Sequence, residues 1–546
     1  MPEFTKIISN FGKKLHNAMK SLLILLALSG PGGFQQALLT LTGASCVEEF
    51  SEDEVQRYQS LAAHPVDLNI AGRSRLLSTG LLTPYQVASL LDYRTRTGDI
   101  LSWTELALVD GFSAEYVTAL REFAVLGVRD AAPGHREDLR FGQELLLRGA
   151  LRTDGSAAGG AKYEAVLGER AAAFVSVRNT LSDPAVGFPT LSAAYYGRGA
   201  LGQLIVGHFN ARFGQGLLQW SGFQLSGFGT LGAFRRNGTG FSPTGSYGAT
   251  LLGVAMDWHF GPWALSAGYS INGNIPIANL TRTWRSATAG VTATSEGASL
   301  EARIARPDWS LFGEAAMFYS GKLTVQAGAY YIPEYGHRIG LLGRWYGRDD
   351  KRYSGVAAGY EGPAFGVTAD AGWRTDTGAA QYKALLRWHP EREWRGFTLC
   401  PECRLQARWR PADPAPLRVE GRVMLAAESG PWLLSARFDA VRCREFAWNW
   451  YAEAGWRTEK AALYLRGGFF KVDAWDDRIY VYERDAPGSF TVPARYGRGW
   501  DASLYGAWHL SRHHSLWLRL ETVRYPWNLT KKEGRTEVRL QYRYRM

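Results

Sequence analysis

From residue 140 to the C-terminus, apolar side chains alternate with small or polar ones. Leu252, Val254, Met256 and Trp258 fall on one face of such a segment, and the residues between them fall on the other. A period of two residues predicts β-strands. The segments are roughly 9–12 residues long, which matches the length of a tilted strand that crosses a membrane. We count roughly 18 segments, within a range of about 16–20, over residues 140–546.

Two architectures have this alternation. A soluble β-propeller or solenoid points its apolar face inward, whereas a transmembrane barrel points it toward lipid. Trp and Tyr gather at segment ends, short turns alternate with longer polar loops, and no fixed repeat supports a propeller. The other face carries Arg, Glu, Asp and Gln, which a dry core could not bury unpaired. The pattern therefore predicts a mainly β protein, a large antiparallel transmembrane β-barrel.

The last eleven residues, TEVRLQYRYRM, alternate most strictly of all. We expect them to be the closing strand, paired with the first strand near Glu144–Arg152, so that the barrel has no free edge. Alternation places charged residues of this and other segments on a lumenal face: Glu537, Arg539, Arg543, Arg545, Arg466, Arg519 and Glu521. Lumenal carboxylates or an anionic solute could balance these arginines.

Residues 47–127 have a helical period instead. Thr83-Pro84 is typical of the N-cap and first position of a helix, which should end near Gly98. Ser102 and Glu105 have the spacing of a capping box. We expect a small all-α module here, joined to the barrel by a linker at residues 128–139.

This module resembles the paired helix-hairpin-helix domain of competence DNA receptors, through "VDLNIAGRSRLL", "STGLLTPYQVASLLDYR" and "LALVDGFSAEYVTAL". In DNA-binding members each hairpin reads Gly-hydrophobic-Gly and presents backbone N–H groups to phosphate. The hairpins here are Gly80, Leu81, Leu82 and Gly111, Phe112, Ser113, so each loses its second glycine. A structural or protein-docking role is favoured over DNA binding.

Two stretches interrupt the alternation. Residues 214–245 are Gly-rich and long, and they form either a constriction inside the lumen, with Arg235 and Arg236 facing the channel, or an outer loop. Residues 476–498, containing "RIYVYERDAPGSF", are expected to form an ordered outer loop.

The N-terminus has the features of an export signal. Lysines at 13, 14 and 20 precede an apolar run at 22–28, which predicts a signal peptide and a poorly ordered start over residues 1–45. Export makes a disulfide between Cys400 and Cys403 the favoured interpretation of the CxxC, with Cys443 as an alternative partner. The chain is basic, with net charge +11 and pI about 9.4, but no block of like charges forms a nucleic-acid arm.

Taken together, these features resemble the helix-hairpin-helix outer-membrane β-barrel proteins of the Bacteroidetes. The resemblance rests on "DLNIAGRSRLL", "GQGLLQWSGF", "RIYVYERDAPGSF" and the terminal strand. It implies the outer membrane of a Gram-negative bacterium, with the helical module periplasmic or inside the barrel. The implied partners are outer-membrane lipid, lipopolysaccharide and envelope proteins.

No catalytic set, metal site or cofactor motif emerges from the sequence. We therefore expect a non-enzymatic channel or scaffold whose helical module plugs the barrel or docks a partner. The alternatives are a nucleic-acid uptake component and an outer-membrane enzyme.

Overall fold

A computed structural model describes most of the chain from residue 31 to residue 546. The segments that it does not describe are 1–30, 43, 45, 51, 128–139, 198, 223–229, 247–250, 285, 307, 335, 348–351 and 529–531. The predicted signal sequence and linker therefore lie largely or wholly outside the described residues.

The N-terminal part of the described chain is helical. Its elements are α2 (Pro31–Thr42), η1 (Val47–Glu49), α3 (Glu52–Ala63), β1 (Val66–Asp67), α4 (Arg73–Thr79), α5 (Pro84–Thr97), α6 (Trp103–Leu106), α7 (Ala114–Leu120) and β2 (Ala124–Val125). None of the helices in this described part has the length and apolar character needed to cross a membrane.

The residues predicted to start and end helix α5, Thr83 and Gly98, do so. Thr83 caps α5 and exchanges hydrogen bonds with Gln86, and Gly98 follows the last turn. Helix α2 extends the module toward the N-terminus, because Leu38 is buried in the same apolar core as the helices of residues 52–120. The ordered module therefore begins before residue 47, within the stretch expected to be poorly ordered.

Residues 141–545 form the barrel. Its strands are β3 (Phe141–Arg152), β4 (Ala157–Leu167), β5 (Ala171–Arg178), β6 (Thr190–Tyr196), β7 (Leu201–Arg212), β8 (Gly240–Pro243), β9 (Leu251–Phe260), β10 (Trp263–Ser270), β11 (Ile275–Thr283), β12 (Ala287–Thr294), β13 (Gly297–Ala305), β14 (Trp309–Phe318), β15 (Leu323–Tyr331), β16 (Arg338–Trp345), β17 (Tyr353–Glu361), β18 (Phe365–Arg374), β19 (Ala380–Trp388), β20 (Arg392–Trp394), β21 (Phe397–Trp409), β22 (Leu417–Ser429), β23 (Trp432–Arg442), β24 (Phe446–Arg457), β25 (Ala461–Val472), β28 (Gly497–His509), β29 (His514–Arg524) and β30 (Arg535–Arg545). The short elements η2 (Leu231–Phe234), η3 (Trp475–Asp477), β26 (Ile479–Tyr480) and β27 (Ala494–Arg495) lie in two long connections.

The barrel is closed and antiparallel, and it has 24 strands, with β8 and β20 as short additions to β7 and β21. The expected number, about 18, was too low. Strands β11 to β13 illustrate the cause: they have 8 or 9 residues each, and β12 is built of Ala, Thr and Gly apart from Val291. The alternation is weak in such strands, so neighbouring strands cannot be separated by pattern alone.

The closing strand is the predicted one. Strand β30 pairs with β3 from Glu144–Arg545 through to Arg152–Glu537. Beyond the last pair, Gln143 and Met546 exchange two backbone hydrogen bonds of 2.9 Å. Because this seam is fully paired, the sheet has no free edge there.

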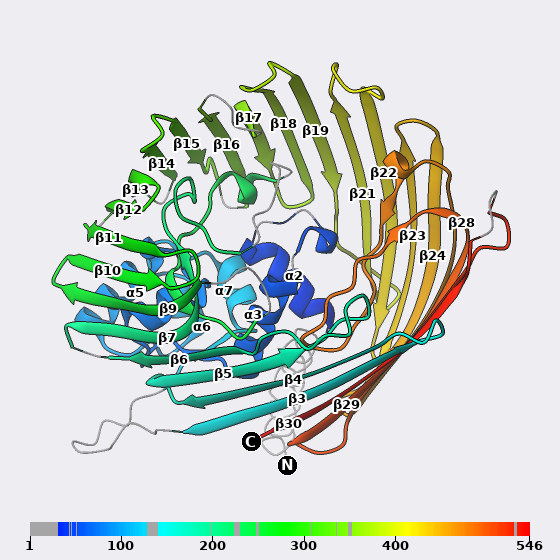
Figure 1. Cartoon of the computed structure of the whole chain (residues 1–546), viewed down its shortest axis with the longest axis horizontal. Coiled ribbons are helices and arrows are strands. Elements are labelled where there is room, and N and C mark those ends of the chain that lie inside the picture. The colour runs from blue at the N-terminus through cyan, green and yellow to red at the C-terminus, as the bar shows by residue number, and fades with distance from the viewer. Residues whose placement is uncertain are drawn as a thin grey trace, which may run out of the picture.

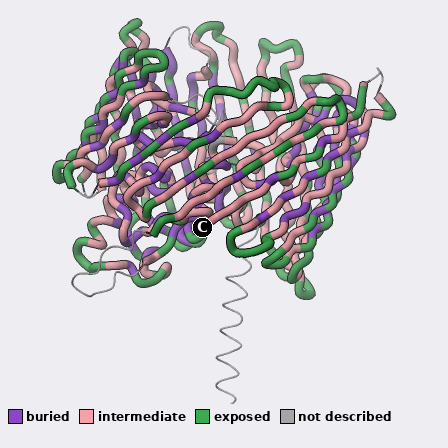
Figure 2. Tube along the Cα trace, turned by 60° about the horizontal axis from the view of Figure 1, so that its bottom comes forward, coloured by how far each residue is buried: buried purple, intermediate pink, exposed green. Residues whose placement is uncertain are grey.

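The two faces of the wall differ in character. Along β30, Leu540 is 51% exposed on the outside, whereas Glu537 and Gln541 are buried on the inside. The same alternation follows the strands around the ring (Figure 2). An apolar outer face and a charged inner face define a barrel that crosses a membrane.

The two rims of the barrel also differ. One rim carries short turns, such as 261–262 and 430–431, together with the C-terminus; we call it the short-turn rim. The other, the long-loop rim, carries connections such as 179–189, 213–250 and 473–496. Exposed tryptophans line both: Trp263, Trp388, Trp432 and Trp456 near the short-turn rim, and Trp345, Trp373 and Trp409 near the long-loop rim. These two belts match the aromatic girdles of membrane barrels.

Cys400 and Cys403 do not form the expected disulfide. Both lie within β21, not in a turn, and their separation of three residues points their side chains to opposite faces of the sheet. Cys400 faces the lumenal side and Cys403 the outer side. Among the described residues, Cys46 and Cys443 form no disulfide either.

Replacing Leu540 by arginine should lower the free energy of unfolding by about 2–4 kcal/mol, because the charge would enter the middle of the bilayer. Leu417, the first residue of β22, offers a matched control, because it lies on the outer face at the long-loop rim opposite Trp409. Leu417→Arg should cost only about 0–1 kcal/mol. Urea titration of both variants in lipid vesicles measures the difference, and equal losses would contradict this placement of the bilayer.

Candidate functional site: the interface between helical module and lumen

The helical module lies inside the ring of strands (Figure 1). Contacts with the wall support this placement: α4 lies against β7 and β8, and α5 against β12. An 18-stranded barrel already encloses a lumen wide enough for water, and 22-stranded barrels hold a plug. The internal module fills space that 24 strands would otherwise leave open.

Near the short-turn rim, polar contacts join the module to the wall. Arg75 forms an ion pair of 2.8 Å with Glu169, which also accepts the backbone N–H of Asp67. Ser74 hydrogen-bonds to His259 at 2.7 Å. Further in, Ser60 Oγ donates to Glu164 at 2.6 Å.

Deeper in the lumen, the short helix η1 is held by three arginines of the wall. Arg437 contacts one carboxylate oxygen of Glu48, and Arg422 lies 3.2 Å from the other. Arg404 donates to Cys46 Sγ at 3.0 Å and lies 3.7 Å from Glu49. We call this cluster of Cys46, Glu48, Glu49, Arg404, Arg422 and Arg437 the η1 seat.

Burial and the nearby arginines together set the protonation states of Glu48 and Cys46 in the η1 seat. Burial alone would raise the pKa of Glu48, but Arg422 and Arg437 more than offset it and hold that pKa well below its ordinary value. Burial raises the pKa of the Cys46 thiol to about 11, although Arg404 opposes the rise. Glu48 is therefore a carboxylate and Cys46 a neutral thiol. Beside them lies a cavity of 180 Å³ lined also by Arg418, Glu420, Asp439 and Tyr480.

The connection between β25 and β28, residues 473–496, links module and wall. It is ordered, as expected, but it folds into the lumen and is not an outer loop. Its Tyr482 donates a backbone N–H to Glu48, and its Gly488 exchanges hydrogen bonds with Gln56 and Gln59 of α3. Phe490 packs near Phe50 of the module, with ring centroids 6.5 Å apart. We call this segment the inner loop.

The inner loop is fixed to the wall by buried ion pairs. Glu483 pairs with Arg519 of β29 and also with Arg495 of the same loop, which in turn lies 2.9 Å from Asp501 of β28. Arg484 pairs with Glu453 at 2.8 Å, and Asp485 with Arg539 at 2.5 Å.

The predicted lumenal charges all lie on the inner face and pair with groups of opposite charge. Arg466 pairs with Glu453 at 2.9 Å, Arg519 with Glu521 at 2.8 Å, and Arg539 with Glu537 at 2.5 Å. Arg545 lies 3.0 Å and Arg543 4.0 Å from Glu144. The sequence left open whether lumenal carboxylates or an anionic solute balances these arginines. In the structure, lumenal carboxylates pair with them.

The described part of residues 214–245 also folds into the lumen. Leu231 and Phe234 of η2 pack with Phe312, Tyr330 and Leu342 on the inner wall. Arg235 lies over the Tyr330 ring at 5.5 Å. Arg236 lies over Trp220 and donates to the backbone oxygen of Gln215. Both arginines are half-buried, and their part in any constriction stays a prediction.

The two hairpins differ in exposure. Gly80 and Gly111 both have positive φ, 71° and 89°, as the turns require. Leu81 and Leu82 are buried, and a Cβ added at Gly80 would meet Arg57 of α3 and Thr239 of the 214–245 segment. In the second hairpin Gly111 and Ser113 are exposed while Phe112 is buried, and Ser113 caps α7. The first hairpin is therefore enclosed and only the second is accessible.

Sequence reasoning missed the η1 seat. Arg404, Arg422 and Arg437 do occupy alternate positions of their strands, so a lumenal orientation was predictable from parity. Their partner Glu48 lies more than 350 residues away along the chain, and no local pattern indicates the pairing. Among the described residues, no group of three or more His, Cys, Asp or Glu is placed to hold a metal ion.

Comparisons with known proteins add the following. No model of a known family and no curated protein matches the chain. Among solved structures, OccK10 (OpdN) of Pseudomonas aeruginosa is similar with a TM-score of 0.33 and 11% identity, over 75% of this chain and 99% of that one. The P pilus usher (PapC) translocation pore is similar with a TM-score of 0.38 and 8% identity, over 74% and 99%. Similarities this weak carry no argument about function.

The geometry of the chain itself defines its class: a large transmembrane β-barrel with an internal helical module.

Proposed function

We propose that this protein is an outer-membrane channel closed by its own helical module. The observation that carries the proposal is the kind of contact between module and lumen. Ion pairs and hydrogen bonds dominate at Arg75–Glu169, Ser60–Glu164 and the η1 seat. Water can hydrate both partners of such contacts once they separate, whereas two packed apolar surfaces gain no comparable contact with water. A module held in this way can leave its seat without unfolding.

The orientation follows from the rims. Membrane barrels of bacteria have short periplasmic turns and longer outer loops. The short-turn rim, which carries the C-terminus, would then face the periplasm, and the anchors Arg75 and Ser74 would lie at the periplasmic end of the lumen.

Docking of a periplasmic partner is a second candidate. Leu101 and Leu108, on either side of α6, are 71% and 83% exposed. Both lie on a part of the module that the wall does not cover. A partner that bound there could draw the module out of the lumen. DNA uptake has less support, because Leu81 and Leu82 of the first hairpin are buried.

Single-channel conductance in planar bilayers tests the plug. The full chain, with its four cysteines replaced by serine, would carry Ser60→Cys and Glu164→Cys, and a short bifunctional thiol reagent would join the two positions. The uncrosslinked protein should show openings, and crosslinking should abolish them. A variant without residues 31–127 should conduct at least roughly tenfold more than the full chain, because it loses the helical module from a lumen that is wide enough for water in barrels of this size.

The single variants Ser60→Cys and Glu164→Cys, treated with the same reagent, control for modification alone. If the crosslinked, uncrosslinked and truncated forms are equally silent, the channel proposal fails and the barrel is a scaffold. If crosslinking leaves the openings unchanged, current does not depend on movement of the module.

A further inference from the structure

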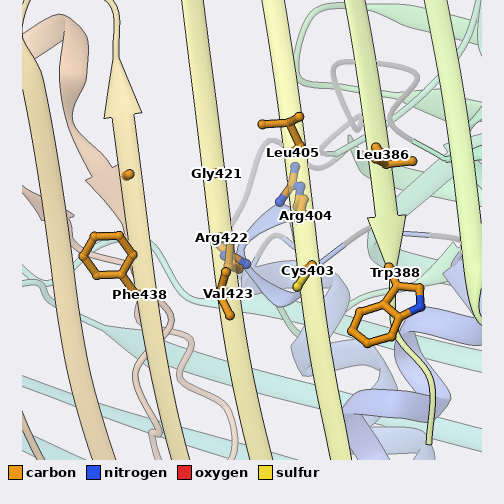
Figure 3. Close-up of a pocket in the computed structure, with 10 residues that line it drawn as sticks. Leu386, Trp388, Cys403, Arg404, Leu405, Gly421, Arg422, Val423 and Phe438 are labelled. Atoms are coloured by element: carbon orange, nitrogen blue, oxygen red, sulfur yellow. The ribbon is translucent and has the colours of Figure 1, made fainter.

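The outer wall has an apolar hollow at β19, β21, β22 and β23 (Figure 3). Its volume is 310 Å³, near the lower end of pockets that hold small ligands. Side chains facing the bilayer surround it: Leu386, Trp388, Cys403, Leu405, Val423 and Phe438. Arg404 and Arg422 contribute to its floor, but their charged groups point into the lumen, where they contact Cys46 and Glu48.

The hollow exists because Gly421 has no side chain. Its neighbours on the outer face in adjacent strands are Leu405 and Ala440. The backbone at Gly421 does not have a positive φ, so the conformation does not demand glycine. A Cβ added there would meet no atom within 4 Å. Glycine weakens a strand interior, and here the only structural effect we find is an opening in the lipid-facing surface.

Water does not suit this opening, because its outer surface is apolar and faces hydrocarbon. If the hollow were empty, the side chains that line it would lose dispersion contacts. The surrounding bilayer supplies hydrocarbon chains, and one of them can fill the hollow. Trp388, one of the tryptophans near the short-turn rim, lies at one end of the hollow, so a chain entering there comes from the leaflet on that side.

A polar group lies beyond that end. Strand β20 extends the wall past Trp388 on the short-turn side, and Arg392 pairs there with Leu399 of β21. Paired residues point to the same face, and Leu399 has the same parity as Cys403 and Leu405, so Arg392 is on the outer face. It is exposed. A phosphate group at this level would find a guanidinium group below the hollow.

We propose that the Gly421 hollow holds one acyl chain of a phospholipid from the leaflet at the short-turn rim, with Arg392 near its phosphate. The inference rests on the proposed orientation, in which this leaflet is periplasmic. It does not rest on conduction, so a failure of the lipid site and a failure of the channel give different results.

The test uses the full chain with Cys46, Cys400 and Cys443 replaced by serine, which leaves Cys403 in the hollow. Palmitoyl-oleoyl-phosphatidylethanolamine is titrated into the detergent-solubilised protein. Native mass spectrometry should find one retained phospholipid. At lipid concentrations about ten times the dissociation constant, the reaction of Cys403 with N-ethylmaleimide should slow about tenfold.

Gly421→Leu fills the hollow and should abolish both retention and protection of Cys403. Gly149→Leu is the matched control, because Gly149 is another glycine on the outer face with no atom within 4 Å of an added Cβ. It should leave both unchanged, and Arg392→Gln should weaken retention.

Three results would overturn the proposal: retention that survives Gly421→Leu, protection of Cys403 that accompanies formation of a dimer without bound lipid, and selective retention of lipopolysaccharide over the phospholipid. The first would place the lipid elsewhere, the second would make the hollow a contact between copies, and the third would assign it to the other leaflet.

Discussion

Replacing Glu48 by glutamine should release the helical module from the lumen. Glu48 is buried between Arg422 and Arg437 and accepts the backbone N–H of Tyr482 in the inner loop. Breaking a buried ion pair costs about 3–5 kcal/mol, because the remaining charge has no partner. Asp439 still contacts both arginines, so we expect about 3 kcal/mol. The ratio of seated to unseated module should fall roughly a hundredfold.

Hydrogen exchange of residues 47–63, compared with the barrel strands, measures this release. Glu49→Gln is the matched control: Glu49 adjoins Glu48 but is 27% exposed and lies 3.7 Å from Arg404. It should change the seating by less than about 1 kcal/mol. Equal exchange rates in the two variants would contradict the role given to Glu48.

The same carboxylate sets a pH dependence. Its pKa in the folded protein lies well below the ordinary value, so its contribution is complete above the pKa of an unfolded glutamate, about 4.3. The contribution is lost only as pH falls through the lower folded pKa. The module should therefore stay seated at pH 5, and loosening between pH 7 and pH 5 would contradict this assignment.

Glu483→Gln should detach the inner loop from the wall. Glu483 is 2% exposed and lies between Arg495 of the same loop and Arg519 of the wall, each 3% exposed. Burial raises its pKa, but the two arginines outweigh burial and lower it. Removing the charge leaves Arg495 with Asp501 and Arg519 with Glu521 as partners, so a loss near 3 kcal/mol is expected, at the low end for buried pairs.

The measurement is the denaturant midpoint in vesicles together with proteolysis of residues 479–495. Asp476→Asn, at the start of the same loop, supplies the control, because its pair with Arg444 is about half exposed. An exposed pair is worth at most about 1 kcal/mol. If the loop resists protease in Glu483→Gln as well as in Asp476→Asn, the ion pairs of Glu483 do not fix it.

The terminal strand shows what the sequence can predict. A period of two residues assigns each side chain to a face, and burial of one face excludes a slip of one residue. The partner segment Glu144–Arg152 followed from the requirement that a barrel close on itself, and the pairing confirms it. The helix starts at Thr83 and Ser102 were predictable because capping depends on neighbours within three residues.

Other features depend on contacts that no local pattern encodes. Strands such as β12, made mainly of Ala, Thr and Gly, carry too little contrast between faces to be counted. The inner loop was expected outside because irregular polar segments usually lie on the surface. Its actual position is fixed by the ion pairs of Glu483 with Arg519 of β29 and of Arg495 with Asp501 of β28, and by the hydrogen bond between Gly488 and α3. Cys400 and Cys403 suggested a local disulfide, but they lie in a strand that extends past the end of β19 to pair with β20.

The positions of the η1 seat along the chain have a consequence for assembly. The module is synthesised first, but its seat is made by Arg404, Arg422, Arg437 and the inner loop, all within the last third of the chain. A chain that stops before β22 has a finished module with no place to bind it. Seating is therefore coupled to completion of the wall, and an unseated module would mark barrels whose last strands have not yet joined.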